Sequence, residues 1–215
     1  MMWEEYYSVL RELPDWLKKP APFIVEAIPL FKKHEAQLIL DLGCGVGRNL
    51  VYLGKEGFDV IGVDLSRSAL KKTKVLSKSE GSHNVAVLRA SMINLPFVRQ
   101  VFHAVISVSV VHHALEKDVK KTIKEIHTVL REDGLFLANL LSIEDPRYGS
   151  GEKLEEGSFK VLDDFDEKQF MEIHHFFSKK EVKALLECFK RNNMEPLHTG
   201  KKEGVHRYWK IIAVK

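Results

Sequence analysis

Three glycines at alternate positions, Gly43, Gly45 and Gly47, follow a short apolar run that contains an acid, Asp41. Glycine has no Cβ, so a turn of this kind lets the backbone approach a ligand closely. Two common nucleotide-binding turns do not match the spacing. A P-loop ends in Gly-Lys-Ser/Thr, but here Arg48 follows the last glycine. The dinucleotide fingerprint Gly-x-Gly-x-x-Gly would need its third glycine at that same position. A third class of nucleotide cofactor is therefore indicated.

A second acid and two pairs of histidines could add to this chemistry. Asp64 ends an apolar run about 20 residues after the glycines, where a carboxylate can accept both ribose hydroxyls of an adenosine-containing cofactor. His112 and His113 follow another apolar run and are candidates for a general base. The alternative is that one is a turn residue and the other a packing residue. His174 and His175 precede a late helix and could face the same pocket.

The spacing of metal-binding residue types predicts no metal site. No pair of histidines matches the His-Glu-x-x-His pattern of a zinc helix. The two cysteines, Cys44 and Cys188, have neither a metal-ligand nor a disulfide spacing. A reducing, cytoplasmic location fits this cysteine usage best.

Five stretches together resemble the class I S-adenosylmethionine-dependent methyltransferases, specifically the small single-domain type that acts on metabolites. They are ILDLGCGVGRNL (39–50), FDVIGVDLS (58–66), LRASMINLPF (88–97), VFHAVISVSVVHHAL (101–115) and VLREDGLFLANLL (129–141). Each stretch alone is weak, but their order and spacing are specific to this family. The resemblance covers residues 37–215 and implies S-adenosylmethionine as cofactor and S-adenosylhomocysteine as product.

The resemblance also implies which residues bind the cofactor. They are Asp41, Gly43, Cys44, Gly45, Gly47, Arg48, Asp64, Leu65, Ser91, Met92, Ser107 and Val108. Two positions depart from the family pattern. Ser91 stands where an aspartate usually accepts from the adenine amine, and a serine hydroxyl makes a weaker bond without charge assistance. His103 replaces a second aspartate.

These residues require a framework of alternating strands and helices. Near-continuous apolar runs predict parallel strands that are covered on both faces, at 38–42, 58–63, 85–88, 101–107 and 135–141. Helices are expected at 47–55, ended by Gly57, at 66–77, capped by Ser66, at 119–130, and from Ser178 to about Arg191. A hairpin is expected over 195–199 and 206–214. The predicted fold is α/β: a doubly wound, mostly parallel, Rossmann-like sheet with a C-terminal antiparallel hairpin.

The chain is predicted to form one methyltransferase domain with two segments outside the core pattern. Residues 1–34 are expected to form an N-terminal helical lid, and 144–177 an insertion that also serves as a lid, because long irregular segments in compact domains are usually functional. The cofactor core is 37–143, and 178–215 forms the last helix and hairpin. The acceptor pocket is predicted to be lined by Tyr6, Tyr7, Trp16, His174 and His175.

Composition and charge narrow the class of partner. The chain has 215 residues and a net charge of +3, and its lysine clusters are interleaved with acids, which favours solvated surface over a nucleic-acid stripe. Its apolar runs are too short for a membrane helix. Ser107-Val108-Ser109-Val110 stands where methyltransferases of base amines often have Asn/Asp-Pro-Pro-aromatic. A small-molecule acceptor is therefore predicted. A tRNA methyltransferase and a catalytically silent partner subunit remain alternatives, and the oligomeric state is open.

Overall fold

The computed structural model of the chain describes residues 2–165, 168–199 and 205–215. Its centre is a seven-stranded sheet in the order β3-β2-β1-β4-β5-β10-β9. The strands are β1 (Leu38–Leu42), β2 (Asp59–Asp64), β3 (Val85–Arg89), β4 (Phe102–Val108), β5 (Leu130–Leu141), β9 (Arg191–Thr199) and β10 (His206–Val214). The first five are parallel, and β10 runs antiparallel to both β5 and β9. The predicted doubly wound fold with a C-terminal hairpin is thus confirmed.

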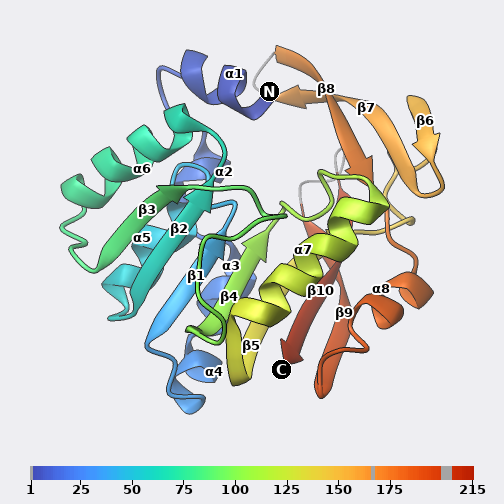
Figure 1. Cartoon of the computed structure of the whole chain (residues 1–215). Coiled ribbons are helices and arrows are strands. Elements are labelled where there is room, and N and C mark those ends of the chain that lie inside the picture. The colour runs from blue at the N-terminus through green and yellow to red at the C-terminus, as the bar shows by residue number, and fades with distance from the viewer. Residues whose placement is uncertain (1, 166–167, 200–204) are drawn as a thin grey trace.

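Helices cover both faces of this sheet (Figure 1). They are α3 (Pro22–Glu26), α4 (Ile28–Lys33), α5 (Arg48–Lys55) and α6 (Arg67–Ser79) on one face, and α7 (Glu116–Val129) and α8 (Lys179–Leu185) on the other. Successive side chains of a strand point to opposite faces. In β1, Leu40 and Leu42 therefore pack with α7 and α8, while Ile39 packs with α3, α4 and α5. This two-sided burial is why the strands read as continuous apolar runs.

The predicted helix signals are confirmed at three positions. The Ser66 hydroxyl accepts a hydrogen bond from the backbone N–H of Ala69, and the Ser178 hydroxyl accepts one from that of Glu181. Gly57, just after α5, has a φ of +95°, which a residue without Cβ adopts without strain.

Two predicted boundaries lie furthest from those of the structure. The fifth strand begins at Leu130 instead of residue 135, because Leu130 pairs with Phe102 and the polar residues that follow form an irregularity within the strand. The late helix ends at Leu185 instead of about Arg191, since residues from Arg191 onward pair with β10 as its outer neighbour.

Helix α1 (Met2–Val9) of the first segment and the second segment lie beyond the carboxyl ends of the parallel strands, at the top of Figure 1, whereas α3 and α4 of the first segment pack on the sheet. The N-terminal segment forms α1 and α2 (Asp15–Lys18) before α3. The segment expected to be an irregular insertion contains a second, antiparallel sheet of β6 (Glu152–Glu155), β7 (Ser158–Phe165) and β8 (Lys168–His175). Among the described residues, no helix is both long and apolar enough to cross a bilayer.

Candidate active site

The glycine turn between β1 and α5 depends on glycine at all three positions. Gly43, Gly45 and Gly47 have φ values of +71°, +55° and +88°, which residues with a Cβ rarely adopt. A Cβ on Gly43 would overlap the side chain of Val110, and one on Gly45 would lie 3.0 Å from the Tyr7 hydroxyl oxygen. The turn is therefore a narrow cradle. Tyr7 of α1 and Val110, just after β4, lie close against its glycines.

Asp64, at the end of β2, joins this turn to the start of α6. Its Oδ2 accepts a hydrogen bond from the backbone N–H of Gly45 at 2.9 Å, and its Oδ1 accepts one from that of Ser66 at 2.8 Å. Burial raises the pKa of the carboxyl, and these two hydrogen bonds oppose the rise. The next residue, Leu65, is exposed and lines a surface pocket of about 390 Å³ with Glu4, Arg67 and others.

Asp41 is an acid deep in the protein with an unused acceptor. The residue is 1% exposed, and its Oδ2 has no hydrogen-bond partner. Burial raises the pKa of Asp41 to about 7, although the nearby Arg48 lowers it. The Arg48 guanidinium donates to the backbone carbonyl of Trp16 at 2.5 Å, and burial lowers its pKa. Buried polar atoms are normally paired, so Asp41 marks a place where a cationic ligand group would be accommodated.

The other predicted cofactor residues lie in different settings. The Cys44 thiol points into the core and lies next to Gly62 of β2, so close that a Cβ at that glycine would be 2.8 Å from the sulfur. Only the backbone of Cys44 therefore faces the turn. Ser107 is fully buried with an unpartnered hydroxyl, and Val108 ends β4. Ser91 and Met92 are half-buried after β3, and Ser91 forms a backbone bridge with Asn94.

Helix α1 lies across the start of α6 and contributes a residue that the sequence analysis did not identify. The Glu4 carboxylate accepts hydrogen bonds from the hydroxyls of Ser66 and Ser68, each at 2.7 Å, and these bonds lower its pKa to about 2. Tyr7 is buried at the glycine turn. Tyr6 packs edge-on against Phe170 of β8 at 5.8 Å between ring centroids. An acid near a helix N-terminus is a recognisable signal, but nothing in the sequence indicates which helix Glu4 reaches.

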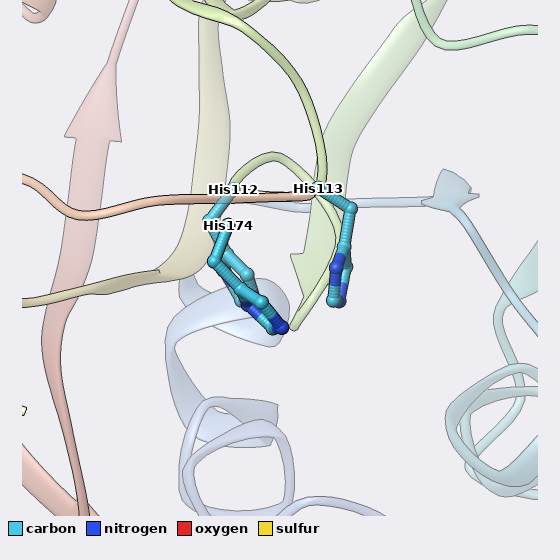
Figure 2. A group of neighbouring side chains, drawn as sticks. All are labelled: His112, His113 and His174. Carbon is cyan, nitrogen blue, oxygen red and sulfur yellow. The ribbon is translucent and has the colours of Figure 1, made fainter. Parts of the chain in front are cut away.

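Three histidines from two distant segments meet at the end of β4 (Figure 2). His112 and His113 lie in the turn between β4 and α7, and His174 lies in β8. One ring nitrogen of each lies within 4.8 Å of those of the other two. A backbone hydrogen bond of 2.7 Å from the N–H of His175 to the carbonyl of His112 holds the two segments together. We call His112, His113 and His174 the histidine group.

Burial dominates the electrostatics of this group. It lowers the pKa of His112 well below the usual value for histidine, with neighbouring imidazoles as a second cause. It lowers the pKa of His113 to about 3. Both rings are therefore uncharged at neutral pH. The Nδ1 atoms of His112, His113 and His174 are buried and without a hydrogen-bond partner.

A chain of charged residues supports His174 from within the insertion. Its Nε2 lies 2.5 Å from Oδ2 of Asp163, whose Oδ1 accepts from the Arg147 guanidinium at 2.9 Å. The same guanidinium donates to Asp145 at 2.9 Å. Glu172, also in β8, has its Oε1 4.0 Å from Nδ1 of His113, and burial raises its pKa to about 7. None of these four charged residues stands in a recognisable motif, which is why sequence reasoning missed them.

Of the five predicted pocket residues only His174 belongs to the histidine group, and His175 and Trp16 have other contacts. Both ring nitrogens of His175 are engaged, with the Ser158 hydroxyl and with the Glu181 carboxylate, each at 2.7 Å. His175 therefore connects the insertion to α8 and is not aligned with the other three histidines. Trp16 is 41% exposed, and its ring stacks on Tyr6 at 6.4 Å.

Comparison with known proteins agrees with this geometry. The sequence model of the methyltransferase domain matches residues 39–134. A Geobacillus protein that is named as a methyltransferase is 31% identical over 121 residues, which is 56% of this chain and 49% of that protein. A tRNA (carboxymethyluridine(34)-5-O)-methyltransferase of Arabidopsis thaliana is 33% identical over 128 residues, 59% of this chain and 28% of that protein. The chain spans about half the length of the curated relatives that it matches first.

Solved structures share the fold. A methyltransferase of Methanosarcina mazei has a TM-score of 0.73 at 23% identity and covers 87% of this chain and 97% of its own. The Burkholderia thailandensis 1,6-didemethyltoxoflavin-N1-methyltransferase, solved with 1,6-didemethyltoxoflavin and S-adenosylhomocysteine, has a TM-score of 0.68 at 18% identity. It covers all of this chain, which covers 87% of it.

The parallel sheet, the glycine turn with its two acids and these matches point to one class of protein. Residues 39–134 match the methyltransferase domain, and the chain is similar to proteins that are named as methyltransferases and shares the fold of S-adenosylmethionine-dependent methyltransferases. This similarity agrees with the cofactor that the glycine turn predicts.

Proposed function

We propose that this chain transfers a methyl group from S-adenosylmethionine to a small-molecule acceptor. The observation that carries the proposal is the cradle of three left-handed glycines next to a buried acid with an unused oxygen, Asp41. Such a cradle admits a ligand against the backbone, and the acid suits a ligand that carries a positive charge. S-adenosylmethionine has both an ammonium and a sulfonium, so the residues present fit this cofactor.

The position of each residue in the cradle supports a specific role in cofactor binding. The glycines make room for the methionine part, and Asp41 would pair with its ammonium. Asp64 would accept from the ribose hydroxyls while it holds the N–H of Gly45. Arg48 would reach the carboxylate only by exchanging its present bond to the Trp16 carbonyl. When bound, the cofactor supplies an already activated methyl group, so the protein contributes alignment, which is worth about 7–11 kcal/mol in well-oriented systems.

The acceptor would enter beside the histidine group, under α1 and β8. Trp3 packs edge-on against His113 at 5.3 Å between ring centroids, so aromatic rings from the N-terminal segment reach the predicted catalytic pair, His112 and His113. Because burial keeps both imidazoles uncharged, each offers a lone pair and not a charge. The Burkholderia enzyme, which shares the fold, was solved with bound 1,6-didemethyltoxoflavin, which supports a small-molecule acceptor.

The cofactor assignment is tested by ligand-induced stabilisation. S-adenosylmethionine and S-adenosylhomocysteine should each stabilise the protein by about 2.7 kcal/mol at a hundred times their dissociation constants. Asp64→Ala should weaken binding by roughly 1.5–3 kcal/mol, the usual contribution of hydrogen bonds to a charged group. Asp59→Ala, at the exposed start of the same strand, is the matched control and should bind normally. Stabilisation by NAD or ATP, with none from these two ligands, would refute the assignment.

A tRNA acceptor is the second candidate, because the Arabidopsis relative is named for a modified tRNA. Binding of tRNA that weakens steeply with salt, followed by methyl incorporation into it, would favour this alternative. A silent partner subunit is the third. Cofactor binding without turnover, together with a stable heteromeric partner, would favour that one.

A further inference from the structure

The histidine group carries an inference beyond methyl transfer. Three histidines that each have a buried Nδ1 without a hydrogen-bond partner meet in one place among the described residues. Each unsatisfied buried polar group costs about 1–3 kcal/mol, and native proteins keep few of them. Packing alone does not explain why three should gather where one ring nitrogen of each lies within 4.8 Å of the others. A ligand that takes several lone pairs at once would explain it.

The hydrogen-bond partners of these histidines favour a lone pair on one nitrogen of each ring, which a cation could accept. His174 has its Nε2 on the Asp163 carboxylate, the arrangement that orients most metal-ligating histidines and leaves Nδ1 as the ligand. The rings of His112 and His113 each have a backbone carbonyl beside them, of Asn139 and Ile173 respectively. A carbonyl favours the N–H form of the ring nitrogen that faces it and so leaves the other nitrogen with its lone pair.

We propose that His112, His113 and His174 bind a divalent transition-metal ion, with Zn²⁺ as the reference ion, through their Nδ1 atoms. Neutral imidazoles suit zinc, iron, nickel and copper better than magnesium or calcium, which prefer oxygen. Zn–N bonds of about 2.0–2.1 Å in a tetrahedron place the nitrogens about 3.3 Å apart. The ring nitrogens, which lie within 4.8 Å of one another, would therefore move closer by up to about 1.5 Å on binding, and the carboxylate of Glu172, 4.0 Å from His113, would balance part of the charge.

Three protein ligands leave a tetrahedral ion with one open position, as in catalytic zinc sites. Water would occupy it in the resting protein. An acceptor hydroxyl, thiol or carboxylate would replace that water and be held at the turn after β4; this last step rests on the proposed methyl transfer, whereas the metal site does not.

The metal site is tested on the full chain after dialysis against a chelator. Co²⁺ should bind at about one ion per chain and show the visible absorption of tetrahedral coordination, and Zn²⁺ should displace it. His174→Ala should weaken Zn²⁺ affinity more than about 100-fold. Asp163→Asn, which weakens the support of His174 and the ion pair with Arg147 but removes no proposed ligand, should weaken it about 10- to 100-fold. His198→Ala, at an exposed position of β9, is the control and should leave the affinity unchanged.

Circular dichroism and S-adenosylhomocysteine binding report whether each variant folds. His113→Ala serves as a second ligand variant if His174→Ala does not. The site is refuted if the wild-type chain binds no Co²⁺ at about one per chain, or if a folded ligand variant binds Zn²⁺ as tightly as wild type. Metal binding without any S-adenosylhomocysteine binding would instead reject the proposed function and leave the metal site standing.

Discussion

Replacing Asp41 by asparagine should stabilise the free protein at pH 8 and weaken its hold on the cofactor. Burial raises the pKa of this carboxyl from 3.8 to about 7, so folding favours its protonated form. The protonated form of Asp41 contributes its full amount to the free energy of unfolding below pH 4, and this contribution is lost as the pH rises through 7. The rise in pKa corresponds to about 4 kcal/mol at 1.36 kcal/mol per unit. Asparagine resembles the protonated acid and does not titrate, so it avoids this loss.

Urea unfolding of wild type and Asp41→Asn at pH 4, 6 and 8 measures the difference directly. The two proteins should have similar stability at pH 4, and the variant should be the more stable by up to about 4 kcal/mol at pH 8. Subtracting the pH–stability curve of wild type from that of the variant cancels the contributions of titrating groups that both proteins share. The ionisable groups that act on Asp41 are Arg48 and Asp64, and the Cys44 thiol lies nearby; none of them is changed.

Calorimetry supplies the second half of the test. Pairing with the cofactor's ammonium requires the ionised acid, so wild-type affinity for S-adenosylhomocysteine should increase as the pH rises from 6 to 8. The affinity of Asp41→Asn should be weaker and free of that component. Parallel pH–stability curves for the two proteins would refute the assignment of a raised pKa to Asp41. Equal affinities would remove Asp41 from the cofactor site.

Three further changes test other parts of the site. Gly43→Ala should destabilise the protein by about 2–4 kcal/mol in urea unfolding, because it combines a left-handed φ with overlap on Val110; a smaller cost would mean that the turn can relax. Ser91→Asp should maintain or tighten S-adenosylhomocysteine binding in calorimetry, and a large loss would show that Ser91 does not face the adenine. Deletion of residues 1–18 removes Tyr7 from the glycine turn and Glu4 from the start of α6 and should give a folded protein with weak cofactor retention and little activity; cofactor binding and activity like those of the full-length chain would reject the lid hypothesis.

The strands and the glycine turn could be located from the sequence because their signals are local. Buried parallel strands read as apolar runs, and the residues proposed to bind the cofactor follow those strands within a few positions. Asp64 illustrates this: it was assigned from its place at the end of a strand, and the structure puts its carboxylate on the N–H of Gly45. The ends of β5 and α8 were misplaced because strand pairing with distant residues, and not local propensity, sets them.

The strands of the insertion could not be predicted because they invert the usual alternation of buried apolar and exposed polar residues. In β7, Asp163 is buried while the neighbouring Leu162 is 49% exposed, so alternation of apolar and polar residues gives no clear strand signal. Asp163 is tolerated inside because Arg147 and His174 pair with it. The sequence named His112, His113 and His174 as site residues but gave no sign of a metal site, because pattern reading detects ligands that are close in sequence and His174 joins the other two only through tertiary contacts.

The origin of His174 in a separate sheet gives the fold a modular character. The glycine turn, Asp41 and Asp64 all belong to β1, β2 and their connections, whereas the third histidine and its supporting acid come from β7 and β8. Two hydrogen bonds, from the N–H of His175 to the carbonyl of His112 and from the N–H of Glu116 to the Glu155 carboxylate, connect this sheet to the segment between β4 and α7. Exchange of that insertion, by evolution or by design, would replace the chemistry above the sheet while β1 and β2 keep their sequence.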